Sequence, residues 1–323
     1  FEKAVSLHKA GKAKEAIATY HELLKLQPNT PMARFNLGEL YLEQGNLKSA
    51  EAQFRQVVKA LPKLPEGYFR LATVLAQQKK WNEATQMAQK GVQLAPNSAE
   101  GHFVLGVIYL SQGRLAEAEK SLLRSKQLNP KAVNTQFNLA YVYLQRRQPQ
   151  KAIPILKNLT QQEPKNPGAW AGLAMAYDIA GDLPQASKAY KQALSLQPKN
   201  RDLTLRLAIV LTRMNRHRES LQLLENLVKT YPDDAGLWFA IGQAHFNLQQ
   251  YREAEIAFRK VLQYQPKNVA AQANLALCVL NQNQLDNARK EYEKLRQIQP
   301  RDKNAVMGLA YIAETQGRWD DAL

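Results

Sequence analysis

Apolar and polar positions alternate along the chain with the period of amphipathic helices. In segment 33–43 the apolar residues include Leu37, Leu40 and Tyr41, which follow the i, i+3, i+4 spacing of one helix face. A polar Gln-Gly-Asn segment interrupts this face, and segment 48–60 resumes it. The pattern predicts two helices of about a dozen residues joined by a tight turn.

Proline marks the end of this helix pair at a fixed interval along the whole chain. Nine of the 15 prolines lie 34 residues apart, and each follows a predicted second helix. Proline has no backbone N–H and cannot continue helical hydrogen bonding, so it ends a helix. The series consists of Pro28, Pro62, Pro96, Pro130, Pro164, Pro198, Pro232, Pro266 and Pro300.

Small and large apolar residues keep the same 34-residue register. Ala50 and its equivalents are predicted to lie where the two helices of a pair cross closely, and Gly38, Gly106 and Gly242 do the same in first helices. The large apolar series fills the space between neighbouring pairs. One pair cannot bury its apolar face alone, so the pairs must stack.

We therefore predict one all-α solenoid over residues 1–323, with repeats ending near the nine prolines and a partial tenth repeat over 301–323. Pro154 lies inside the second helix of the fifth repeat, and we expect a bend or a lost backbone hydrogen bond there.

This series of residues resembles the tetratricopeptide repeat family over the whole chain. The resemblance implies about ten antiparallel helix pairs of 34 residues in a right-handed superhelix. First helices would line a concave groove and second helices a convex side, and function would be protein binding. The residues that carry it are clearest in the sixth repeat: Trp170, Leu173, Ala174, Tyr177, Ala186, Tyr190, Ala193 and Pro198.

Candidate groove residues come from the first helices. Aromatic side chains would receive side chains of a bound peptide, and asparagines could bond its backbone, similar to the asparagine ladder of O-GlcNAc transferases. The alternative is that these phenylalanines pack against a neighbouring helix. The candidates are Phe35, Asn36, Phe69, Arg70, Phe103, Phe137, Asn138, Tyr141, Met175, Arg206, Phe239 and Asn274.

The formal net charge of +16 favours acidic partners or anionic membrane surfaces, without identifying one. Nucleic acid binding is not expected, because no nucleic-acid-binding module is present. Basic residues cluster in two turns between helices, which we predict as anion contacts: Arg146, Arg147, Arg213, Arg216 and Arg218.

Catalytic and metal-binding constellations are not found in the sequence. The five histidines fall in different repeats, and the single cysteine, Cys278, is predicted to be a small buried residue. There is no glycine-rich phosphate loop. We therefore expect no enzymatic activity, no cofactor and no small-molecule substrate.

Two functional hypotheses follow. The Gln-rich repeats resemble those of bacterial exopolysaccharide-secretion and envelope-assembly proteins, which implies a scaffold in a multiprotein assembly. The alternative is the substrate-recruiting arm of a glycosyltransferase or sulfotransferase. The chain starts without Met and stops within a helical pattern, so we expect a fragment of a longer protein. The bacterial periplasm or envelope is the favoured compartment, with the cytoplasm as the alternative.

Overall fold

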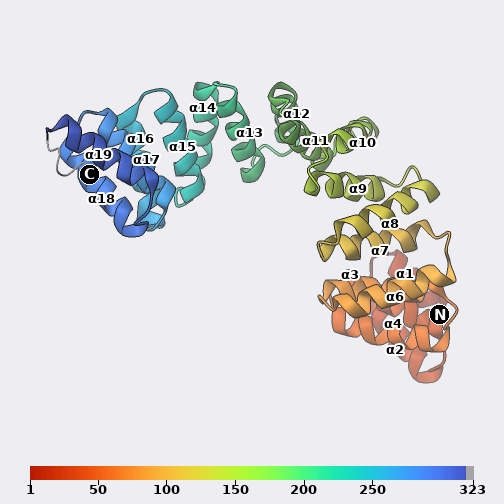
Figure 1. Cartoon of the computed structure of the whole chain (residues 1–323). Coiled ribbons are helices and arrows are strands. Elements are labelled where there is room, and N and C mark those ends of the chain that lie inside the picture. Colours follow the sequence, from red (N-terminus) through yellow and green to blue (C-terminus); the bar gives the residue numbers. More distant parts are fainter. Residues whose placement is uncertain (318–323) are drawn as a thin grey trace. The chain divides into compact units, whose positions relative to one another are not determined.

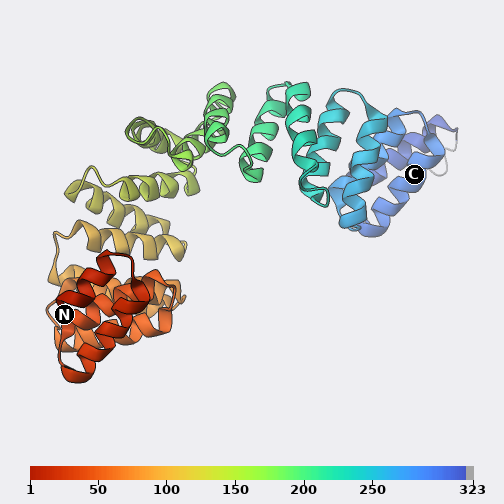
Figure 2. The same ribbon diagram turned by 180° about the vertical axis from the view of Figure 1, so that it is seen from behind.

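A computed structural model describes residues 1–317 of the chain, and these residues form 19 helices and no strand. The chain divides into two compact units, Phe1–Gln162 (unit 1) and Glu163–Leu323 (unit 2). In each unit, helix pairs stack one after another (Figures 1 and 2). The all-helical fold class is confirmed for the described residues, while one continuous solenoid over 1–323 stays a prediction.

The helices follow the predicted 34-residue register. Unit 1 contains α1 Glu2–Lys9, α2 Ala13–Leu26, α3 Pro31–Glu43, α4 Leu47–Ala60, α5 Pro65–Gln77, α6 Trp81–Leu94, α7 Ala99–Ser111, α8 Leu115–Leu128, α9 Val133–Gln145 and α10 Pro149–Gln162. Unit 2 contains α11 Pro167–Ala180, α12 Leu183–Leu196, α13 Arg201–Arg213, α14 His217–Val228, α15 Ala235–Asn247, α16 Tyr251–Tyr264, α17 Val269–Asn281, α18 Leu285–Ile298 and α19 Lys303–Thr315. The last helix is the first of the tenth repeat, and residues 318–323 lie outside the described residues.

The turn inside each helix pair depends on one residue with positive φ. These residues also recur every 34 positions, and five of the ten are not glycine. A side chain in this left-handed conformation costs about 1 kcal/mol, so the tight turn is kept against a local penalty in half of the repeats. The non-glycine residues are Lys79, Arg147, Asn215, Gln249 and Asn283.

Small residues allow the two helices of a pair to cross, as predicted. A Cβ atom built on Gly38 would lie 2.8 Å from the ring of Phe54, and one on Gly242 would lie 2.8 Å from the ring of Phe258. Ala50 is fully buried at such a crossing. Larger side chains at these positions would push the helices apart.

A side-chain hydrogen bond connects most first helices to the end of the preceding repeat. The fourth residue of the first helix donates to the carbonyl oxygen of the repeat-ending proline six residues earlier. Arg34, Tyr68, His102, Gln136, Trp170 and Trp238 all make this bond, at 2.7–3.1 Å. Chemically different side chains therefore serve one structural purpose, because each offers an N–H or O–H at the same place.

Pro154 does not end α10, which continues as one helix from Pro149 to Gln162. Pro154 is exposed. Proline removes one helical N–H, so the carbonyl of Gln150 loses its usual partner four residues later. Water can reach this side of the helix, which explains why the helix tolerates the loss.

Candidate functional site

First helices of successive repeats contact one another, as α5 does with α7, α7 with α9, α13 with α15, and α17 with α19. Within each unit these helices form one surface, which we call the first-helix face. The second helices form the opposite surface, which we call the second-helix face. The expected groove residues all come from helices of the first-helix face.

A cavity of about 590 Å³ opens on the first-helix face of unit 1 between α7 and α9. The predicted residues Phe137, Asn138 and Tyr141 lie together in its wall. Phe137 is 36% exposed and Tyr141 is 40% exposed. The Asn138 amide donates to the Asn134 carbonyl oxygen at 2.9 Å, which leaves the side-chain oxygen of Asn138 as an acceptor. The remaining wall residues are Val107, Leu110, Ser111, Gly113, Leu115 and Gln145.

The aromatic row is not continuous, because Phe69 is buried with only 1% of its surface exposed. A Cβ atom on Gly91 or on Gly101 would lie 2.4 Å from the Phe69 ring. The ring therefore fills the space that these two glycines leave open. Phe69 is a core residue, and the expectation that it lines a groove was wrong.

The other phenylalanines of the row are half-buried and partly serve packing. Phe35 makes an edge contact with Phe54 at 5.6 Å between ring centroids, and Phe239 makes the same contact with Phe258 at 5.5 Å. Phe103 is also half-buried. Packing against a second helix, the alternative that the sequence left open, thus describes Phe35 and Phe239.

Arg70 connects three first helices instead of standing free in the groove. Its guanidinium lies 2.9 Å from Glu39 of α3 and also pairs with Glu100 of α7. Burial raises the pKa of Glu39 above its ordinary value, although the Arg70 charge opposes this shift. Arg70 therefore has a structural role, because it links neighbouring helices of the first-helix face.

The remaining groove candidates are not gathered in the α7–α9 cavity. Asn36 donates to the Tyr20 hydroxyl at 3.1 Å. The others lie on four first helices of unit 2. Arg206 is exposed, whereas Met175 and Asn274 are half-buried like Phe239. Their role in binding stays a prediction.

Three of the five predicted anion contacts are already paired with carboxylates. Arg146 pairs with Glu119, Arg213 with Asp178, and Arg216 with Glu219. Among the described residues, Arg147 and Arg218 are exposed and have no ion pair. These two arginines are the better candidates of the set for contact with an anion.

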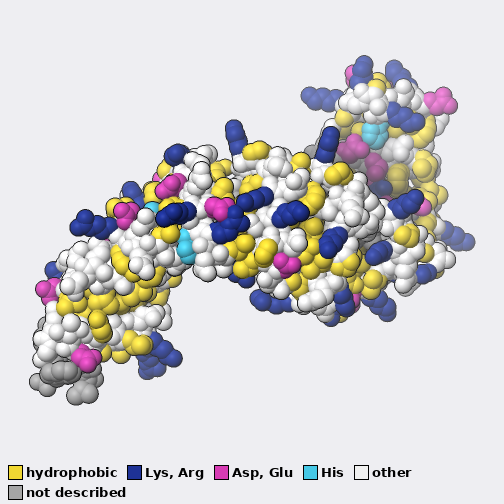
Figure 3. All heavy atoms as spheres, turned by 90° about the horizontal axis from the view of Figure 1, so that it is seen from above, with side chains coloured by type: hydrophobic (Ala, Val, Ile, Leu, Met, Phe, Trp, Pro, Cys, Tyr) yellow, Lys and Arg dark blue, Asp and Glu magenta, His cyan; other side chains and the backbone are white. Residues whose placement is uncertain are grey.

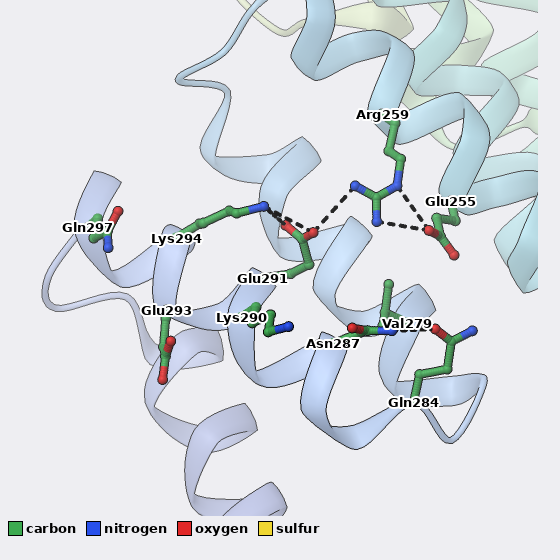
Figure 4. A pocket seen from close by; sticks show the side chains of 10 residues that line it. All are labelled: Glu255, Arg259, Val279, Gln284, Asn287, Lys290, Glu291, Glu293, Lys294 and Gln297. Carbon is green, nitrogen blue, oxygen red and sulfur yellow. Dashed lines mark hydrogen bonds and ion pairs between the residues drawn. The ribbon is translucent and has the colours of Figure 1, made fainter.

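The second-helix face carries a cavity of about 510 Å³ in unit 2 that sequence reasoning missed (Figure 4). Glu291 of α18 lies at its centre with 6% of its surface exposed. It accepts hydrogen bonds from Gln272 at 2.9 Å, from Lys294 at 3.2 Å and from Arg259 at 3.4 Å. Burial alone would raise the pKa of Glu291, but the bonds from Gln272 and Lys294 leave it below its ordinary value. In this cavity the carboxylate of Glu291 is therefore paired with basic side chains of the same chain.

Unit 1 has a cavity of about 530 Å³ at the same register, 136 residues earlier. Leu123 stands where unit 2 has Arg259, Ile155 replaces Glu291, and Asn158 replaces Lys294. No carboxylate lines this cavity. The complete lining is Leu123, Lys126, Pro130, Gln136, Leu139, Tyr143, Gln150, Lys151, Pro154, Ile155 and Asn158.

Cys278 is fully buried, as expected from the sequence. Burial, with a smaller contribution from Glu255, raises the pKa of its thiol to about 12. Within residues 1–317, no group of three His, Cys, Asp or Glu side chains could hold a metal ion. No helix in this part of the chain is long and apolar enough to cross a membrane.

Together, the stacked helix pairs of each unit define a protein built from helical repeats. A family model for the C-terminal domain of cilia and flagella-associated protein 70 matches residues 133–309, more than half of the chain. Models for tetratricopeptide repeats and for subunit 3 of the anaphase-promoting complex match residues 1–65 and 43–125. The chain therefore belongs to the tetratricopeptide repeat family that these models describe.

Solved structures support the same fold. PilF of Pseudomonas aeruginosa is 20% identical with a TM-score of 0.57, over 64% of this chain and 94% of that one. MamA of Desulfovibrio magneticus is 20% identical with a TM-score of 0.51, over 54% of this chain and 98% of that one. YrrB, described as a TPR protein with an unusual peptide-binding site, is 16% identical with a TM-score of 0.51, over 57% and 95%. At these identities the likeness concerns the fold alone, and no curated protein sequence matches the chain.

Proposed function

We propose that this chain is a non-catalytic scaffold whose α7–α9 cavity receives a segment of a partner protein. The observation that carries the proposal is the exposure of Phe137 and Tyr141 opposite Val107 and Leu110. Exposed aromatic side chains beside an apolar cavity are typical anchors of a protein interface, because they bury a large area when a partner binds. The peptide-binding site in the description of YrrB agrees with such a role.

The cavity also offers polar groups that could orient a peptide backbone. Asn138 keeps a side-chain oxygen as an acceptor, and Gln145 and Ser111 lie in the same wall. A peptide in an extended conformation has unpaired N–H and C=O groups that must find partners when it is bound. The apolar wall would contribute most of the affinity, and the amides would fix the position of the peptide along the cavity.

The finer form of the proposal places the scaffold in a bacterial multiprotein assembly of the exopolysaccharide-secretion type. Its support is the resemblance of the Gln-rich repeats to such proteins. The other finer form is the substrate-recruiting arm of a glycosyltransferase or sulfotransferase. The identity of the captured partner distinguishes them, since the first expects assembly components and the second expects acceptor substrates.

The test compares partner capture by the wild-type chain and by a Phe137→Ala, Tyr141→Ala double variant. Tyr311→Ala is the matched control, because Tyr311 has the same repeat position in α19 as Tyr141 has in α9 and is 55% exposed. We expect at least a tenfold loss of partner affinity in the double variant, as for interface anchors worth about 2 kcal/mol or more. Circular dichroism should show unchanged helix content. Capture that survives the double variant, or falls equally with Tyr311→Ala, contradicts the α7–α9 site.

A further inference from the structure

Basic residues are concentrated at the end of unit 1. Residues 120–162 contain eight Lys and Arg and no Asp or Glu. Unit 1 as a whole has 23 basic and 11 acidic residues, hence +12, whereas unit 2 has 21 and 17, hence +4. On the face drawn in Figure 3, Lys and Arg side chains outnumber those of Asp and Glu. The acid-free segment covers most of α8 and all of α9 and α10.

The second-helix cavity of unit 1 is built from these three helices. Lys126 of α8 and Lys151 of α10 lie in its wall. The nearest acidic residue in sequence, Glu119, already pairs with Arg146 and lies 3.7 Å from Lys151. Lys126 has no ion pair among the described residues. The cavity therefore keeps an excess of positive charge.

Apolar groups complete the cavity. Leu123 of α8 and Ile155 of α10 both line it. Pro154 and Gln150 line it as well, and the Gln150 carbonyl has no helical N–H partner at Pro154. Two of the amides inside are engaged, because Gln136 donates to the Pro130 carbonyl and Asn158 donates to the Gln136 side-chain oxygen. The cavity thus offers an apolar wall and two cations, of which Lys151 also lies over the Tyr143 ring, 5.2 Å from its centroid.

We propose that this cavity docks an acidic segment of a partner protein on the second-helix face. An apolar side chain of the segment packs between Leu123 and Ile155, while its carboxylates meet Lys126 and Lys151. This site lies on the second-helix face and is separate from the α7–α9 cavity, which lies on the first-helix face.

The surroundings favour a peptide over nucleic acid or a membrane. Tyr143 is the only aromatic residue of the lining and is 6% exposed, so it cannot serve as a platform for a stacked base. None of the lining residues is a large exposed apolar side chain that could insert into a bilayer. A concave apolar wall with cations at its edge fits a side chain flanked by carboxylates.

The test selects binders from a displayed library of random 12-residue peptides on the wild-type chain. Affinities of the selected peptides are then measured by fluorescence anisotropy. We expect selected sequences rich in Asp and Glu around one apolar residue, with about tenfold weaker binding to the Lys126→Glu variant. Affinity should fall further at 0.5 M salt because ions screen the lysines.

Three variants make the result specific. Lys290→Glu reverses a charge in the unit 2 cavity and should leave binding unchanged, as should Tyr141→Ala in the α7–α9 cavity. Leu123→Ser should weaken binding severalfold while the helix content stays constant. The proposal is overturned if no acidic peptide is selected, if Lys126→Glu and Lys290→Glu act equally, or if only double-stranded DNA or phosphatidylserine vesicles bind.

Discussion

The two second-helix cavities occupy one register in different units and differ in chemistry. In unit 2, Glu291 accepts hydrogen bonds from Arg259, Lys294 and Gln272. Its negative charge is therefore compensated by basic side chains of the same cavity. In unit 1 the equivalent of Glu291 is Ile155, and no carboxylate lines the cavity, although Glu119 lies 3.7 Å from Lys151. The repeat thus determines where a cavity forms, while a few positions decide whether the chain or a partner completes it.

The largest expected effect concerns the position of Pro154, which is Lys290 in unit 2. Lys290→Pro should destabilise α18 by about 3 kcal/mol, because it removes a helical N–H and clashes with the carbonyl four residues earlier. Hydrogen exchange of the α18 amides measures this local effect. Conversely, Pro154→Ala should slow exchange in α10. Equal protection in wild type and Lys290→Pro would show that proline at this position carries no cost in α18.

A smaller effect is expected when the unit 2 network is grafted into unit 1. Ile155→Glu alone should destabilise unit 1 by about 2 kcal/mol, through lost apolar burial and a carboxylate with incomplete partners. Adding Leu123→Arg and Asn158→Lys supplies the missing partners next to Gln136 and should recover about 1 kcal/mol.

Urea unfolding of the single and triple variants checks this graft, with Ile155→Leu as the control for volume. The triple variant should also lose affinity for acidic peptides, since its own carboxylate now occupies the cavity. No recovery in the triple variant would mean that the three positions do not form a network in unit 1.

The smallest effect is the absence of a reaction at Cys278, which lies next to Val279 in the unit 2 cavity wall. Its thiol pKa is raised to about 12, so at pH 8 only about one thiol in ten thousand is ionised. A disulfide reagent should therefore leave the folded chain unlabelled at pH 8 and label it in urea. Fast labelling of the folded chain would show that this wall opens.

The sequence predicted the repeat because its signals are local. The prolines, the small crossing residues and the helix periodicity depend on contacts inside one pair or between adjacent pairs, and the structure confirms them. Phe137, Asn138 and Tyr141 share one helix and lie together in the α7–α9 cavity, while their role in binding stays a prediction.

The misses concern contacts between repeats. Phe69 was placed in the groove because its position is shared with Phe35, but Gly91 and Gly101 open a space that the ring fills. These two glycines were the feature of the sequence that could have indicated a buried Phe69. Arg70 reaches Glu39 and Glu100 across three repeats, and such distances depend on how successive pairs are rotated. The basic cavity was missed because its positions lie on α8, α9 and α10, although the absence of acidic residues over 120–162 was visible.

The hydrogen bond from the fourth residue of six first helices to the preceding proline carbonyl has an evolutionary consequence. Arg, Tyr, His, Gln and Trp all make it at their own junction. At these junctions the bond joins groups six residues apart in the sequence and needs no matching change elsewhere. A gene segment coding for one helix pair could be duplicated or lost with its junction intact, so the number of repeats can change faster than the surface of any one of them.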